Sequence, residues 1–130
     1  MIAVDTNVVV RFLTRDDEQQ YEKSFKLFQE QDIFIPDTVI LETEWVLRSR
    51  YKFEAGKICK AFTNLFGLPN VHIVDADLLA QVLQWHENGL DFADAFHLAQ
   101  SQNCSVIYTF DDKFVKRAEG LTHCQVVQPE

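Results

Sequence analysis

The chain begins with MIAVDTNVVV, residues Met1–Val10, in which a short apolar run ends at the carboxylate of Asp5. The stretch SVIYTFDD, residues 105–112, repeats this pattern, because Val106–Tyr108 lead into Asp111 and Asp112. Continuous apolar runs of this kind are typical of buried central strands in parallel sheets. Bare acids at the ends of such strands need an explanation, since burying an uncompensated carboxylate is costly.

Short β-rich runs alternate with longer helical patterns along the rest of the chain. Strands are expected at Ile2–Val4, Ile33–Ile35, Val71–Val74, Ser105–Thr109 and Gln125–Val127. Helices are expected at Asn7–Leu13 (with Thr6 as N-cap), Glu18–Gln31, Asp37–Tyr51, Glu54–Phe66, from the cap Asp75 to Glu87, Phe92–Gln102 (capped by Asp91) and Lys113–Ala118. This alternation predicts an α/β fold with a mainly parallel sheet covered on both faces. Ligands of such sheets bind beyond the carboxyl ends of the strands, where Asp5 and Asp111 lie.

Size and composition suit one soluble domain. The chain has 130 residues, 47% of them hydrophobic and 25% charged. No apolar stretch approaches the roughly 20 residues of a membrane helix, and the N-terminus lacks a secretory pattern, so we expect a cytoplasmic protein. The three cysteines and four histidines are scattered, which argues against a disulfide framework and a structural zinc site.

The net charge of −8 constrains the choice of ligand. A passive nucleic-acid binder is normally basic, because contacts to phosphate supply much of its affinity. Either nucleic acid is not the ligand, or a cation mediates the contact.

Glu42 is the most informative acid inside a helix. Helical periodicity places Val39, Trp45 and Val46 around it, whereas Glu44 lies four residues before Arg48, a good spacing for an exposed ion pair. Glu42 has no such local partner, so a long-range salt bridge or a bound cation remains for it.

Asp91 and Asp94 occupy the N-cap and N3 positions of the helix in GLDFADAFHLA, which suits either capping or function. Asp5, Asp111 and Asp112 are open to the same two interpretations. If acids from the strand ends and both helices converge, they need a cation, and carboxylates without His or Cys prefer Mg²⁺ or Mn²⁺. A magnesium site can orient a water nucleophile and draw phosphate into an acidic cleft.

Four stretches in this order resemble the PIN-domain ribonucleases, most closely the virulence-associated protein C type of bacterial toxin. They are IAVDTNVVVRFL, VILETEWVLRSRY, LDFADAFHLAQSQNC and VIYTFDDKF. The resemblance implies a single PIN domain over residues 1–130 with a three-layer α/β/α sandwich. It also implies RNA cleavage by water activated by Mg²⁺, with Mn²⁺ as the alternative ion.

Position by position, the resemblance implies that the catalytic and metal-binding acids are Asp5, Glu42, Asp94 and Asp111. Asp112 stays an alternative to Asp111 as the fourth acid, and Asp91 is expected to be a cap or an outer group. Thr6, Asn7 and Thr109 are expected to hydrogen-bond the ligating acids or waters.

The family resemblance further implies an RNA substrate, a cognate antitoxin that occludes the cleft, and a homodimer. Two sets of residues are candidates for these contacts, although core or solvated positions explain them as well. They are the aromatic set Phe25, Phe28, Trp45, Tyr51 and Phe53, and the basic set Arg48, Arg50, Lys52, Lys57 and Lys60.

Other functions remain open. A phosphatase with a nucleophilic Asp after the first strand typically needs a second acid two positions later, where this chain has Asn7. A phosphoacceptor signalling domain needs an acid pair after the first strand, which is not evident. A catalytically inactive PIN fold that acts as a binding module is a third alternative.

Overall fold

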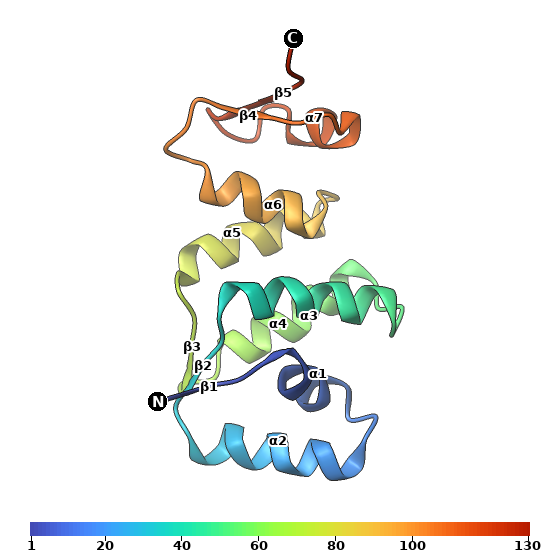
Figure 1. The fold of residues 1–130 in the computed structure, drawn as a ribbon, viewed down its shortest axis with the longest axis vertical. Coiled ribbons are helices and arrows are strands. Elements are labelled where there is room, and N and C mark those ends of the chain that lie inside the picture. Colours follow the sequence, from blue (N-terminus) through green and yellow to red (C-terminus); the bar gives the residue numbers. More distant parts are fainter. The chain divides into compact units, whose positions relative to one another are not determined.

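The computed structural model describes the whole chain, Met1–Glu130, which divides into two compact units, Met1–Ala76 and Asp77–Glu130. Every strand and helix expected from the sequence forms, and each of their ends lies within two residues of the expected position. We describe each unit separately, and Figure 1 shows the elements of both.

The first unit contains three short strands and four helices. In chain order they are β1 (Ile2–Ala3), α1 (Thr6–Thr14), α2 (Glu18–Glu30), β2 (Ile33–Phe34), α3 (Asp37–Ser49), α4 (Ala55–Phe66) and β3 (Val71–His72). The strands form a parallel sheet in the order β1-β2-β3, with Ile2 opposite Ile33 and Ile33 opposite Val71. The predicted parallel pairing is therefore confirmed, and the carboxyl ends of all three strands lie at one edge.

Helix α1 packs between α2 and α3 in the first unit, as Figure 1 shows. Its buried face carries Val9 and Val10, and the Phe12 ring stacks on Phe28 of α2 with ring centroids 4.2 Å apart. Only two residues, Val4 and Asp5, separate β1 from this helix, so packing of its apolar face fixes the segment that carries Asp5.

The second unit contains two strands and three helices. They are α5 (Ala76–Glu87, which starts at the unit boundary), α6 (Phe92–Gln100), β4 (Val106–Tyr108), α7 (Asp112–Ala118) and β5 (Gln125–Val127). Strands β4 and β5 pair in parallel, with Val106 opposite Gln125. The prediction that β1 and β4 are buried central strands is wrong. Val106 and Ile107 of β4 are half-buried and Tyr108 is 67% exposed, while β1 is an edge strand whose Ala3 is exposed.

Buried apolar side chains fix α6 and α7, the two helices of this unit that carry or follow the candidate acids. Phe92, Phe96 and Leu98 of α6 are fully buried, and the ring of His86 from α5 lies edge-on against Phe92. Phe114 anchors α7 in the same way. The longest helices of the chain have 13 residues, and none combines the length and hydrophobicity that crossing a bilayer requires.

Candidate functional site

Asp5 follows β1 and caps α1. Its carboxylate accepts a hydrogen bond of 3.2 Å from the backbone N–H of Val8, which satisfies one of the free donors at the start of the helix. The prediction of Thr6 as N-cap is wrong by one residue, because Thr6 already has helical geometry. Asp5 is solvent-exposed, so capping leaves part of its carboxylate available to a ligand.

Thr6 links α1 to the next candidate acid. Its side chain is only 6% exposed, and its hydroxyl donates a hydrogen bond to the carboxylate of Glu42 on α3. This contact fixes the Glu42 carboxylate against the residue that follows Asp5. It also confirms that Thr6 hydrogen-bonds one of the predicted acids.

The predicted surroundings of Glu42 on α3 are wrong. The buried side of the helix carries Ile40, Thr43, Glu44 and Leu47, whereas Glu42 is exposed and Trp45 is 50% exposed. The apolar residues of α3 form two stripes, and the stripe chosen from the sequence is the outer one. Glu42 therefore needs no cation to compensate for burial, and its nearest fixed partner is Thr6.

Glu44 is the carboxylate that α3 buries. Its side chain is 3% exposed, and Arg48 donates to it at 2.9 Å, so the predicted i,i+4 ion pair is confirmed although its exposure is not. A buried carboxylate with such a partner is compensated, and this explains how an acid is tolerated on the inner face of α3.

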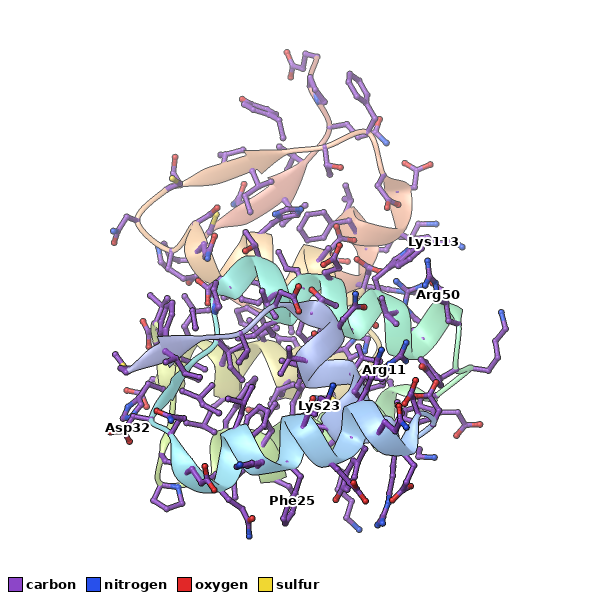
Figure 2. The ribbon with its side chains drawn as sticks, turned by 60° about the horizontal axis from the view of Figure 1, so that its bottom comes forward. Arg11, Lys23, Phe25, Asp32, Arg50 and Lys113 are labelled. Carbon is purple, nitrogen blue, oxygen red and sulfur yellow. The ribbon has the colours of Figure 1, made fainter.

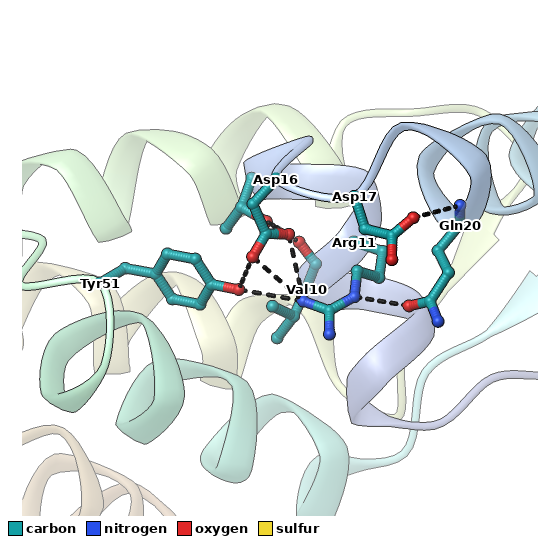
Figure 3. Close-up of polar contacts among 7 residues, drawn as sticks. Val10, Arg11, Asp16, Asp17, Gln20 and Tyr51 are labelled. Atoms are coloured by element: carbon teal, nitrogen blue, oxygen red, sulfur yellow. Dashed lines mark hydrogen bonds and ion pairs between the residues drawn. The ribbon is translucent and has the colours of Figure 1, made fainter.

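A polar network at the far end of α1 fixes the same helices together (Figure 3). Arg11 donates to Gln20 of α2 at 2.6 Å, to Asp16 at 3.1 Å and to the Tyr51 hydroxyl at 3.0 Å, and Tyr51 in turn donates to Asp16. The hydrogen bond from Tyr51 is the main cause that lowers the pKa of Asp16, against the opposing effect of burial. Helices α1 and α3 are thus joined near Asp5 by Thr6, and at the other end Arg11 of α1 contacts Tyr51, two residues after α3 ends.

Acids of the second unit meet in one pocket of about 350 Å³. Asp91, Asp94 and Asp111 line it together with Phe114 and two basic residues of α7. As predicted, Asp91 caps α6, because its carboxylate accepts from the backbone N–H of Asp94 at 3.2 Å. The pocket therefore combines the start of α6 with the start of α7.

Asp94 is half-buried, and its pKa is raised. Burial is the largest cause, the negative charges of Asp91 and Asp111 add to it, and His97 acts in the opposite direction. The ionised carboxylate is thus held at an electrostatic cost in the free protein, which a bound cation would relieve.

Asp111 and Asp112 have different surroundings. Asp111 caps α7 by accepting from the backbone N–H groups of Lys113 and Phe114, at 2.9 and 3.4 Å, and its own N–H donates to Thr109 at 3.0 Å. Asp112 lies inside α7, and its carboxylate accepts from the side chain of Gln128. Of the two, only Asp111 lines the acidic pocket.

The four predicted acids divide equally, with Asp5 and Glu42 in the first unit and Asp94 and Asp111 in the second. In neither unit do three or more His, Cys, Asp or Glu side chains form a group that could hold a metal ion. The assignment of these four residues as metal ligands stays a prediction.

The members of the aromatic set and of the basic set proposed from the sequence differ in burial and in their contacts. Phe28 is a core residue, whereas Phe25 and Trp45 are exposed. The five basic residues are all solvent-exposed, yet Arg48 pairs with Glu44 and Lys57 lies 3.9 Å above the Phe53 ring. Lys113 and Arg117, the two basic residues that line the acidic pocket, are not among the residues predicted from the sequence. Their i,i+4 spacing, which begins two residues after Asp111, is the sequence pattern that could have identified them.

Comparison with known proteins identifies the family to which the chain belongs. The model of the PIN domain family matches residues 2–120, so the chain belongs to the PIN-domain family, and the predicted PIN fold is confirmed. Among curated proteins the comparison found no match. Among solved structures the chain is similar to VapC20 (Rv2549c) of Mycobacterium tuberculosis, described as a sarcin–ricin loop cleaving toxin. The two are 23% identical, the match covers 96% of this chain and 99% of that chain, and the TM-score is 0.42.

Proposed function

We propose that this protein is a Mg²⁺- or Mn²⁺-dependent endoribonuclease whose metal-binding and catalytic acids are Asp5, Glu42, Asp94 and Asp111. Membership of the PIN-domain family supports the reaction class. The observation that carries the proposal is the pocket in which Asp94 and Asp111, from two different helices, lie together with Asp91.

The chemistry of the donors suits a hard divalent ion. All four proposed ligands are carboxylates, and oxygen ligands are those that Mg²⁺ and Mn²⁺ prefer. The raised pKa of Asp94 supports the same assignment, because a cation would relieve the repulsion from Asp91 and Asp111. When bound, such an ion supplies an activated water and stabilises charge on the phosphoryl oxygen.

The chain itself positions these carboxylates through its helix starts and one hydroxyl. Asp5 and Asp111 are each oriented by the helix that they cap, since backbone N–H groups hold one side of each carboxylate. Thr6 orients Glu42 by donating a hydrogen bond to it. We assign the fourth position to Asp111 rather than Asp112, because Asp112 is bonded to Gln128 and does not line the pocket.

The proposal extends to partners. The four motifs that resemble virulence-associated protein C toxins support a role as the toxin of a toxin–antitoxin pair that acts in the cytoplasm as a homodimer. A co-encoded small protein that binds this chain and stops RNA cleavage would support that role. Size-exclusion chromatography with light scattering tests the dimer.

Cleavage of a structured RNA by the purified chain tests the reaction. We expect Mg²⁺ or Mn²⁺ to activate cleavage and EDTA to stop it. Asp5→Asn and Asp111→Asn should abolish cleavage, whereas Asp112→Asn, the matched control, should retain it. Hydrolysis of a small phosphomonoester without RNA cleavage would indicate a phosphatase instead. Specific binding of a partner without either activity would indicate an inactive PIN module.

A further inference from the structure

The acidic pocket of the second unit also has a basic wall. Its lining contains the positively charged Lys113 and Arg117 as well as the negatively charged Asp91, Asp94 and Asp111. Residues 77–130 contain only three Lys or Arg residues, Lys113, Lys116 and Arg117, so two of these three line this one pocket. In a chain with a net charge of −8, this concentration of cations at the candidate site needs a reason.

The pocket cations are not used for structural ion pairs. Arg11, Arg15 and Arg48 each pair with a carboxylate at 2.9 to 3.1 Å. Lys113 and Arg117 form no ion pair or side-chain hydrogen bond, although three carboxylates line the same pocket. Their hydrogen-bond donors are therefore free to bind a ligand.

The geometry of α7 fixes where these cations lie. Phe114 and Ala118 are buried and hold the helix down, while Lys113 and Arg117, four residues apart, share its exposed side. Figure 2 shows the Lys113 side chain extending away from the ribbon. Asp111 accepts from the backbone N–H of Lys113, so one helix turn holds the proposed metal ligand and the first cation.

We infer that Lys113 and Arg117 bind a phosphate of the RNA strand beside the acids that we propose to hold the metal. The inference rests on the proposed function and adds substrate-binding residues to it. An anionic strand is repelled by a pocket of carboxylates, and a guanidinium and an ammonium on the same pocket offset this repulsion locally. Arginine suits phosphate because its planar donors contact two oxygens at once, and lysine binds phosphate as a point charge.

A binding experiment with a matched control tests this inference. Lys113→Gln, Arg117→Gln and Lys116→Gln each remove one positive charge from α7, but Lys116 is exposed and does not line the pocket. Binding of a fluorescent single-stranded RNA is measured in EDTA, which prevents cleavage, with chains that keep native Asp5. We expect Lys113→Gln and Arg117→Gln to weaken binding about tenfold, and to reduce the slope of log K against log salt by about 0.7 each. Lys116→Gln should change binding less than twofold.

Two further readouts separate the possible outcomes. The Mn²⁺-induced rise in melting temperature should be unchanged in Lys113→Gln and Arg117→Gln chains with native Asp5, because these residues do not bind the metal. The inference is overturned if all three variants bind RNA equally, or if Lys116→Gln loses as much binding as the other two. Metal-dependent cleavage by the wild type would still support the proposed function in that case. If the wild type neither binds nor cleaves RNA, both are overturned. Loss of antitoxin binding with unchanged RNA binding would assign the two cations to a protein partner and overturn the inference.

Discussion

Asp5 has a structural role and a proposed chemical role, and two substitutions can separate them. Its carboxylate caps α1 through the backbone N–H of Val8. Asparagine caps helices about as well as aspartate but lacks the negative charge, whereas alanine provides neither. We therefore expect Asp5→Ala to lower the free energy of unfolding by about 1 kcal/mol and Asp5→Asn to lower it by less than about 0.5 kcal/mol.

Urea denaturation without metal measures these stabilities, and RNA cleavage should be lost in both variants. A stability loss in Asp5→Asn as large as that in Asp5→Ala would show that the charge itself holds α1. Retained cleavage in Asp5→Asn would remove Asp5 from the catalytic acids.

Asp94 gives the second prediction at the scale of the residue. Its pKa in the folded protein is raised, so the folded state holds the proton more tightly than the unfolded state does. The stabilising effect of this proton is complete below the unfolded-state pKa and is lost as the pH rises through the folded-state pKa. Asp94→Asn removes this titration, so its stability relative to the wild type should increase between pH 3 and pH 7.

Urea denaturation of both chains in EDTA across this range checks the sign of the Asp94 effect. A relative stability that is flat or falls with pH would show that burial and the Asp91 and Asp111 charges do not raise the pKa of Asp94 as the structure indicates. His97→Gln serves as a comparison, because it removes the neighbour whose charge lowers the pKa of Asp94. It should steepen the loss of stability with rising pH.

At the scale of the element, the position of α3 against α1 depends on the network around Tyr51. The Tyr51 hydroxyl accepts from Arg11 at 3.0 Å and donates to Asp16. Tyr51→Phe leaves the ring in place and removes both hydrogen bonds, so we expect a loss of about 1 kcal/mol in unfolding free energy. Tyr21→Phe is the matched control, because the Tyr21 ring stacks on Phe12 while its hydroxyl makes no hydrogen bond.

Thermal and urea denaturation of the two tyrosine variants measure this difference. Equal stability of Tyr51→Phe and Tyr21→Phe would show that the network contributes nothing to holding α1 and α3 together. Because Glu42 lies on α3 and its partner Thr6 on α1, Tyr51→Phe should also reduce the RNA cleavage rate more than Tyr21→Phe does.

The elements also show what the sequence can and cannot predict. Hydrophobic patterns and capping residues located every strand and helix within two residues, and Asp91 caps its helix as expected. For Asp111 the sequence left capping and function open, and the structure shows that it caps α7. The orientation of α3 was not predictable in this way, because Val39, Trp45 and Val46 form an apolar stripe as plausible as the buried one. The buried Glu44 needed its Arg48 partner, and a local pattern does not reveal whether such a pair lies inside or outside.

At the scale of the whole molecule, the proposed metal ligands come in pairs from both units. A ligand that binds only the native state stabilises it, by about 2.7 kcal/mol when its concentration is 100 times the dissociation constant. Glu42→Gln and Asp111→Asn each remove one proposed metal ligand, so each should reduce the rise in melting temperature with Mn²⁺. Glu22→Gln and Glu119→Gln remove exposed carboxylates from the first and second unit, respectively, and should leave the rise intact.

Differential scanning calorimetry with and without saturating Mn²⁺ measures these shifts, and EDTA reverses them. Loss of the shift in Asp111→Asn but not in Glu42→Gln would confine the ion to the pocket of Asp91, Asp94 and Asp111. Glu42 would then be an exposed residue of α3 held by Thr6, without a part in metal binding. A smaller rise in both variants would support both carboxylates as metal ligands, because each substitution removes one negatively charged oxygen donor that Mn²⁺ prefers. An unchanged rise in both variants would remove Glu42 and Asp111 from the proposed metal ligands.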